Sequence, residues 1–396
     1  MVHIQQRKMV RKASDIFLGI AFLALIFLPM CVMVLPANRA GVLPDNAEKM
    51  PVSPLQYYRR NVWLKPIVEL YDGTQTFLYR FKNTFILRET FVRWHGEAKV
   101  NWFKTSSSRD VVLGKQGWLF YTGDESIQDF RHLYPSSPKQ LESMRAIFQE
   151  MHDRLATRGI KFLVVVAPDK HSIYPEFMPD TLRQLKGQSR LDQLAQIMKK
   201  QSLINFLDLR PTLLDARKSR LVYHANDTHW NDYGSFAAYQ ATATRLKAWY
   251  PQLKIASLQD YKVETIWRKG GDLTRLLGLR KETPTRYQSL RAISKNRIAT
   301  EQKIQPPSLN DSFQSGILTR SRNGEIPRAI FFGDSFSDTK LRPFLAQHFK
   351  EGHWYRFGQR RTIYFDLVDR IKPDLVIFET AQRQLTQTKI EAAPKS

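Results

Sequence analysis

Along the second half of the chain, short apolar runs alternate with longer stretches whose apolar positions recur at helical spacing. The runs rich in β-branched and aromatic residues predict buried strands at 160–168, 204–209, 328–335 and 374–380. The periodic stretches predict helices from Pro138 to about Gly159, at Leu191–Lys200, at Asp232–Tyr250 and at 344–349. Buried strands that alternate with helices form a parallel sheet covered on both faces. The pattern therefore predicts an α/β domain.

Less regular segments flank and interrupt this alternation. Residues 36–75 contain five prolines and are interpreted as a linker, and the spaced aromatics of 76–105 predict helical structure packed on the body. The sequence VVLGKQGWLFYTGD (111–124) predicts two short strands, 111–113 and 118–121, around a glycine-containing turn. Residues 255–325 break the pattern and are interpreted as an insertion. The main domain is placed at 76–390.

The N-terminal region has the pattern of a membrane anchor. Ile16 to Leu35 form a 20-residue run without a charge, which as a helix spans about 30 Å, enough for a bilayer. The run is longer than the apolar core of a cleaved signal peptide, and no small-residue cleavage site follows it. Four basic residues precede it, so by the positive-inside rule residues 1–15 are cytoplasmic. The rest of the chain is then expected in the periplasm of a Gram-negative bacterium, anchored to the inner membrane.

Composition narrows the possible partners. The chain has 61 Lys+Arg against 37 Asp+Glu, and only four of the basic residues and one acidic residue lie in residues 1–35. The body of the protein is therefore basic, which favours polyanions as partners or is simply a soluble basic surface. Motifs of nucleic-acid binding are missing from the sequence, and the predicted location also argues against nucleic acid. The single cysteine, Cys31, excludes a disulfide framework and a cysteine-based zinc site.

Ser335 is the candidate nucleophile. The sequence FFGDSFSDTK (331–340) places it at the end of a predicted strand, where a tight turn into a helix would expose its hydroxyl as in esterases. A polar turn residue remains the alternative. Polar residues also follow the other predicted strands, at 167–170 and 379–383, and ligands of open α/β sheets bind at such carboxyl ends.

The loop YHANDTHWNDYG (223–234) offers partners for a serine nucleophile. Asp227 and His229, two positions apart, would project to the same side in extended backbone and could act as the base and its orienting carboxylate. Three alternatives stay open. Asp227 or Asn226 could cap a helix, His229 could be a packed aromatic ring, or a metal could be held by His224, Asp227, His229 and Asp232.

Several blocks together resemble a known family, the AlgJ/AlgX-type SGNH-hydrolase-like O-acetyltransferases of exopolysaccharide modification. They occur in the family's order and cover roughly residues 75–385: 111–124, 159–179, 226–239, GGDLTRLLGL (270–279), 328–338 and PDLVIFETAQRQL (373–385). The resemblance implies that Ser335 is the nucleophile, that His229 is the general base and then the general acid, and that Asp227 orients the imidazole. Neither a cofactor nor a metal is expected.

The chain departs from the pattern in two places. Separate glycine and asparagine blocks that complete the oxyanion hole of ordinary SGNH esterases are not identified, so only the Ser335 backbone N–H is assigned as a donor. Family members often have Glu-Arg where this chain has Gln382-Arg383. Arg383 keeps the cation and is a candidate substrate contact, as are Trp230 and Arg275; Lys170 is a further candidate or a structural residue.

The resemblance implies transfer of acetyl groups to hydroxyls of an extracellular, anionic, alginate-like polysaccharide. A membrane-bound O-acyltransferase is expected to supply the acetyl group, within a polysaccharide modification and export complex at the inner membrane. Ten Lys and Arg residues within 266–303 favour a polyanionic acceptor, with a solvated basic loop as the alternative. The alternatives are a periplasmic carbohydrate O-acetylesterase with the same triad, a non-catalytic polysaccharide-binding or assembly protein, and a metal-dependent enzyme.

Overall fold

The computed structural model describes most of the chain from residue 88 onward and one short helical segment before it. The described residues are 68–75, 88–182, 184–185, 187–201, 203–279, 284–305, 313–358 and 360–388. They belong to two units, Met1–His95 and Gly96–Ser396. The predicted anchor at 16–35 and most of the linker lie outside the described residues. Within the part that is described, helices long and apolar enough to cross a membrane are absent.

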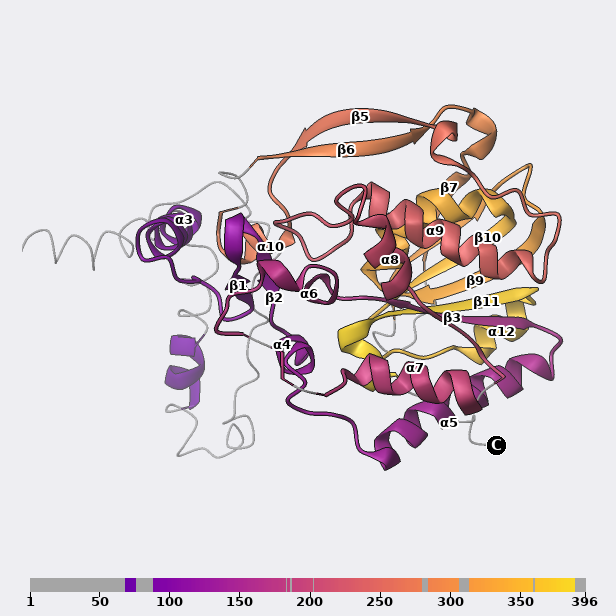
Figure 1. Ribbon diagram of the computed structural model, residues 1–396, viewed down its shortest axis with the longest axis horizontal. Helices are drawn as coiled ribbons and strands as arrows, with labels where there is room; N and C mark the ends of the chain where they lie inside the picture. The colour runs from indigo at the N-terminus through magenta and orange to yellow at the C-terminus, as the bar shows by residue number, and fades with distance from the viewer. Residues whose placement is uncertain are drawn as a thin grey trace, which may run out of the picture. The chain divides into compact units, whose positions relative to one another are not determined.

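The second unit is built on a seven-stranded mixed sheet (Figure 1). Its order is β4 (Asn205–Asp208), β3 (Lys161–Ala167), β11 (Leu375–Ala381), β9 (Ile326–Gly333), β10 (Phe349–Phe357), β8 (Phe313–Arg320) and β7 (Thr300–Ile304). Neighbours from β4 to β10 are parallel, whereas β8 and β7 continue the sheet antiparallel. The four predicted strands are confirmed, but the purely parallel sheet is wrong.

Helices cover both faces of the sheet. On one face lie α5 (Pro138–Ala156), α7 (Arg190–Gln201) and α12 (Phe365–Ile371); on the other lie α8 (Arg210–Ala216), α9 (Asp232–Lys247) and α11 (Arg342–Leu345). Successive residues of β3 face opposite sides of the sheet. Val164 packs in the core under α5, α7 and α12, and Val165 packs in the core under α8, α9 and α11. Both are fully buried. Each such side chain stabilises the fold by about 1.5–3 kcal/mol, which explains the uninterrupted apolar runs of these strands.

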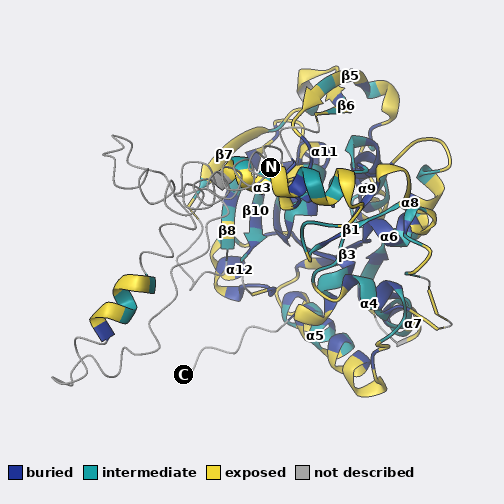
Figure 2. Cartoon of the chain, turned by 90° about the vertical axis from the view of Figure 1, so that its left-hand side faces the viewer, coloured by how far each residue is buried: buried dark blue, intermediate teal, exposed yellow. Residues whose placement is uncertain are grey.

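Residues 255–325 are more regular than the sequence pattern predicts. They contain a two-stranded antiparallel ribbon, β5 (Tyr261–Arg268) and β6 (Thr285–Ala292), as well as the sheet strands β7 and β8. The ribbon projects beyond the sheet and its helices (Figures 1 and 2). One face of each of these strands is solvated, so their sequences lack the long apolar run that identifies a buried strand.

Segments from the start of the second unit close one end of the sheet. The paired strands β1 (Val111–Leu113) and β2 (Leu119–Tyr121), both predicted, pack with α10 (Asp272–Leu276) in a small apolar cluster of Val111, Leu119, Leu273, Leu277 and Leu279. Short helices α4 (Ser126–Phe130) and α6 (Lys170–Ile173) follow. Of the predicted helical stretch 76–105, residues 88–105 are described. They form α3 (Arg88–Glu97) and a π-helical turn at Ala98–Trp102, whereas 103–105 are not helical.

Candidate active site

Ser335 lies in the turn that leads from β9 into a helix. The strand ends at Gly333, the first helical residues are Ser335 and Phe336, and a π-helical turn follows at Ser337–Leu341. Gly333 leaves no room for a larger residue, because a Cβ there would lie 2.1 Å from Ser337 Oγ. The predicted strand–turn–helix setting of Ser335 is therefore present, with the serine half-buried.

Asp334 holds this turn in place with its carboxylate. Oδ1 accepts a hydrogen bond from the Phe336 backbone N–H at 2.8 Å, and Oδ2 accepts one from the Ala381 N–H at 2.9 Å. The second bond ties the turn to the carboxyl end of β11. Because both bonds use an ionised oxygen and lie away from bulk water, they are stronger than ordinary backbone bonds.

Three predicted residues form one hydrogen-bonded chain. His229 Nε2 lies 2.7 Å from Ser335 Oγ, and His229 Nδ1 lies 2.7 Å from Asp227 Oδ1. With a carboxylate at Nδ1, that nitrogen carries the proton, which leaves the Nε2 lone pair facing the serine hydroxyl. This is the tautomer in which His229 can take a proton from Ser335.

The loop conformation that brings Asp227 to His229 is not extended, as the sequence analysis assumed. Asp227 Oδ1 also accepts a hydrogen bond from the His229 backbone N–H at 2.9 Å, which folds residues 227–229 into a local turn. An isolated β-bridge between Tyr223 and Trp230 closes the loop. Helix α9 is capped by Asn231, whose side chain accepts from the Gly234 N–H, so neither Asp227 nor Asn226 serves as its cap.

Opposing effects act on the pKa of Asp227. Burial raises the pKa, but the side-chain hydrogen bond to His229, the charge of His229 and the backbone bond lower it by more. The net result is a pKa well below the ordinary range of aspartate. The carboxylate therefore stays ionised and can stabilise a positive charge that forms on His229.

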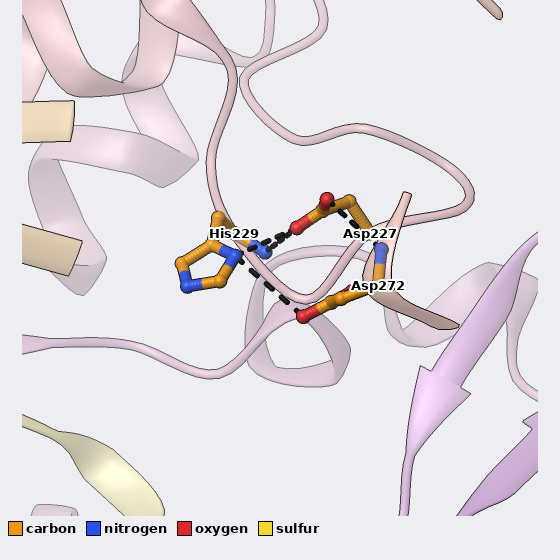
Figure 3. Close-up of side chains that lie close together, drawn as sticks. All are labelled: Asp227, His229 and Asp272. Atoms are coloured by element: carbon orange, nitrogen blue, oxygen red, sulfur yellow. Dashed lines mark hydrogen bonds and ion pairs between the residues drawn. The ribbon is translucent and has the colours of Figure 1, made fainter. Parts of the chain in front are cut away.

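A second carboxylate, Asp272 at the start of α10, was not predicted (Figure 3). Its Oδ2 lies 3.7 Å from His229 Nδ1, and its Oδ1 accepts from the Thr228 N–H at 2.8 Å. The Asp272 backbone N–H donates to Asp227 Oδ2 at 3.2 Å. Asp272 is thus hydrogen-bonded to both Asp227 and Thr228. It belongs to the block GGDLTRLLGL (270–279), in which the sequence analysis gives a candidate role to Arg275 but none to Asp272.

The metal alternative is not supported in the form that the sequence suggested. The His224 ring packs on Tyr287 with 4.1 Å between ring centroids, and Asp232 Oδ2 accepts from Ser289 Oγ and the Leu290 N–H. Across the described ranges, the one acidic–histidine group with metal-like spacing is Asp227, His229 and Asp272. Both ring nitrogens of that histidine already have partners in the hydrogen-bonded chain.

Lys170 is hydrogen-bonded to the loop that carries Asp227 and His229. Its ammonium donates to the backbone oxygens of His224, Ala225 and Asp227, at 3.1, 3.0 and 2.7 Å. Burial lowers the pKa of Lys170 to about 7, against the opposing charges of Asp227 and Asp272. Since the side chain is only 4% exposed, the prediction that it contacts substrate is replaced by the structural alternative: Lys170 fixes the loop that carries Asp227 and His229.

The other predicted substrate contacts differ in accessibility. Trp230 is fully buried and packs edge-on against Phe336, so it shapes the site from inside and does not reach a substrate. Arg383 is nearly buried and pairs with Asp169, while its guanidinium lies 5.8 Å from the centre of the Phe336 ring. Arg275, on α10, is exposed. Of the four candidates, Arg275 alone is freely accessible.

A buried acid lies directly under the nucleophile turn. Glu379, on β11, is fully buried, and its Oε2 accepts from the Asp334 backbone N–H at 3.0 Å. Burial raises the pKa of Glu379 well above its ordinary value, and the negative charge of Asp334 raises it further. The raised pKa favours the protonated, neutral form, which can hydrogen-bond to the turn without adding a second buried charge.

Glu379→Gln is expected to change how stability depends on pH. A carboxyl whose folded pKa is raised contributes most below 4.5, its ordinary pKa, and this contribution is lost as the pH rises toward the folded pKa. Glutamine keeps a neutral acceptor and a donor, so the variant should lack this decline. Urea unfolding of both proteins across the pH range measures the free energy of unfolding and its pH dependence.

Glu379→Ala leaves the Asp334 N–H unpaired and should lower the free energy of unfolding by about 1–3 kcal/mol. Equal pH slopes for wild type and Glu379→Gln would contradict a raised pKa of Glu379.

Comparison with known proteins identifies the family of this chain. Residues 111–352 match the family model described as "SGNH hydrolase-like domain, acetyltransferase AlgX". The chain belongs to this family. The match confirms the resemblance inferred from the sequence blocks, and it covers the strands and loops that carry Asp227, His229 and Ser335.

Two curated relatives and one solved structure are similar to parts of the chain. A probable alginate O-acetylase AlgJ from Pseudomonas aeruginosa is 32% identical over 142 residues, which span 35% of this chain and 32% of that protein. A protein of the same description from Pseudomonas syringae is 25% identical over 280 residues, or 69% of each chain. The solved structure of Bacillus cereus PatB1 has a TM-score of 0.51 at 13% identity, covers 69% of this chain and 96% of that one, and shows the shared fold.

Proposed function

We propose that this protein is an O-acetyltransferase that moves acetyl groups onto hydroxyls of an anionic, alginate-like extracellular polysaccharide. The observation that carries the proposal is the continuous chain Asp227–His229–Ser335, with 2.7 Å at each link. Membership in a family described as acetyltransferases supports the reaction class, and the names of the AlgJ relatives support the polymer class.

In the first half-reaction, Ser335 Oγ attacks the carbonyl carbon of an acetyl donor while His229 Nε2 takes the hydroxyl proton. Asp227 stabilises the imidazolium that results. The Ser335 backbone N–H donates to the developing oxyanion in this proposal. When the tetrahedral species collapses, His229 gives its proton to the leaving group, and an acetyl ester remains on Ser335.

In the second half-reaction, a sugar hydroxyl takes the place of the leaving group. His229 removes the proton from that hydroxyl, the alkoxide attacks the acetyl ester, and Ser335 recovers its proton as the acetylated sugar departs. If water attacks instead, the same residues hydrolyse the ester. Acceptor binding and exclusion of water therefore decide between a transferase and an esterase.

We also propose the setting that the sequence suggests. The anchor at 16–35 would hold the catalytic domain at the periplasmic face of an inner membrane. A membrane-bound O-acyltransferase would pass the acetyl group across, because the periplasm offers no acetyl-CoA. Such a pair would act within a polysaccharide modification complex.

The decisive experiment supplies the detergent-solubilised full chain with 4-nitrophenyl acetate as donor and alginate oligosaccharides as acceptors. Mass spectrometry of the sugars is expected to show acetylated products that are missing with Ser335→Ala. Release of acetate without acetylated sugar would make the protein an esterase. Neither product, from protein with a native circular dichroism spectrum, would favour the non-catalytic alternative.

A further inference from the structure

The β5–β6 ribbon is firmly attached to the body at one end. Leu290 packs into the main core, and Asp232, in the first turn of α9, accepts hydrogen bonds from Ser289 Oγ and the Leu290 N–H, both at 3.0 Å. Tyr261 packs edge-on against Phe236 of α9, with 5.2 Å between ring centroids. These contacts fix where the ribbon points (Figure 2).

The other end of the ribbon carries an exposed aromatic side chain among cations. Trp267 is 70% exposed and is paired across the ribbon with Arg286, which is also exposed. Arg268 and Lys269 follow directly. A tryptophan this exposed contributes little to the core. Trp267 differs from other exposed aromatic residues such as Trp102 because Arg286 lies opposite it in the ribbon and Arg268 and Lys269 follow it in sequence.

Positive charge on the ribbon is largely uncompensated within it. Glu264 is the one acidic residue in the two strands, and its carboxylate pairs with Arg291 at 2.7 Å. The charge of Glu264 is therefore paired with Arg291 and not with the cations at the Trp267 end of the ribbon. Arg268 instead lies over the Tyr287 ring, 5.9 Å from its centre. The charged residues that the two strands carry at the Trp267 end, Arg268 and Arg286, are therefore both cations.

This end of the ribbon adjoins the loop of the catalytic histidine. Asn226 Nδ2 donates to Thr285 Oγ1, and Thr285 is paired with Arg268 across the ribbon. Gly271 is packed so closely on the loop that a Cβ would lie 2.6 Å from Asp227 Cβ. The end of the ribbon is thus hydrogen-bonded directly to Asn226, the residue that precedes Asp227.

We propose that the Trp267 end of the ribbon is the acceptor-binding arm of this enzyme and that its ligand is an acidic polysaccharide. The inference rests on the proposed function and adds the residues that hold the acceptor. The flat indole suits the apolar face of a sugar ring, and the guanidinium of Arg286 suits a uronate carboxylate, to which arginine can donate two parallel hydrogen bonds. The attachment to the 226–227 loop brings the bound polymer toward Ser335.

The test measures binding apart from chemistry. Full-chain protein with Ser335→Ala, which cannot turn over, is titrated with alginate oligosaccharides by calorimetry, with and without Trp267→Ala or Arg286→Ala. Each substitution is expected to weaken binding by several-fold, and the pair by about tenfold or more. Added salt should weaken oligosaccharide binding by the parent and also by Trp267→Ala, because Arg286 remains in that variant. Uncharged cello-oligosaccharides should bind more weakly than alginate oligosaccharides in every case.

Matched controls are Trp102→Ala, which removes an indole that is 79% exposed elsewhere in the unit, and Arg245→Ala, which removes an exposed cation from α9. Both should bind like the parent. Unchanged affinity in the ribbon variants, or equal loss in the controls, would overturn the proposal. Binding of the same variants to phosphatidylglycerol vesicles is measured in parallel. If the ribbon variants lose vesicle binding but keep the parent's affinity for the sugar, the ribbon is assigned to a lipid surface and the proposal is overturned.

A kinetic readout separates this proposal from the proposed function. In the active protein, Trp267→Ala and Arg286→Ala should raise the KM for the oligosaccharide. The rate of 4-nitrophenyl acetate hydrolysis should change by a smaller factor. If the parent hydrolyses the ester but acetylates no sugar, the transferase proposal fails, whereas the calorimetric result still decides whether the ribbon binds polyanionic sugar.

Discussion

Ser335→Ala is expected to reduce acetyl transfer by about 10⁴- to 10⁶-fold, because it removes the proposed nucleophile. The hydroxyl is the group that faces the free nitrogen of the Asp227–His229 pair, since His229 Nε2 lies 2.7 Å from Ser335 Oγ. Without it, water activated by His229 is the remaining route. Rates of 4-nitrophenyl acetate cleavage and of sugar acetylation measure the loss.

The fold should survive the change, because the turn is held by Asp334 and Gly333 and not by the Ser335 side chain. Thermal unfolding should therefore match that of the wild type. An exposed serine such as Ser219 provides the matched substitution, which should leave activity intact. Intact-protein mass spectrometry after rapid quenching should show one acetyl group on wild type only. Substantial activity in Ser335→Ala would rule out the acetyl-serine route.

Asp227→Asn is expected to lower activity by about 10⁴-fold, the typical loss when the orienting carboxylate of a triad becomes an amide. An amide can present its NH₂ to His229 Nδ1 and so favour the wrong tautomer, and it cannot stabilise the imidazolium by charge. Because the folded pKa of Asp227 is depressed, its stabilising contribution is present above 3.8, the ordinary pKa, and is lost as the pH falls through the folded value. The variant should lack that contribution at neutral pH.

Asp272→Asn is the natural comparison, since it changes a second carboxylate at the same imidazole. Its bond to the Thr228 N–H can be kept by an amide oxygen, and its Oδ2 lies farther from His229 Nδ1, at 3.7 Å against 2.7 Å for Asp227. We expect a loss of about tenfold. Kinetics of the two variants side by side discriminate the roles: equal losses would mean that the two carboxylates share the task of orienting the histidine.

The strands and helices that a sequence can reveal are those buried on both faces or clearly amphipathic. Strand β3 and helix α5 are of this kind, and both were predicted within a few residues. Strand β10 was missed because Lys350, Glu351, His353 and Arg356 interrupt its aromatic residues. Its neighbours in the sheet provide the burial that its own sequence does not suggest. The antiparallel strands β7 and β8 were missed for the same reason.

Within the site, short-range pairing was easier to predict than accessibility. Asp227 and His229 are two residues apart, and chemistry alone suggested that they act together. Asp272 reaches them only because Gly271 packs onto the loop, a contact that depends on the folded chain. Trp230 and Lys170 have side chains suited to sugar binding, but the fold buries both. Burial of individual polar or aromatic residues is a property of tertiary packing, which local sequence does not encode.

The separation of His229 and Ser335 along the chain, 106 residues, makes the serine a reporter of folding. The two meet only after α9 has docked and β9 has taken its place beside β11, so an unfolded or half-assembled chain holds an ordinary, unreactive hydroxyl. A fluorophosphonate probe, which labels activated serines, should therefore count the native molecules in a preparation. Such a titration would give the fraction of competent enzyme before any acceptor is identified.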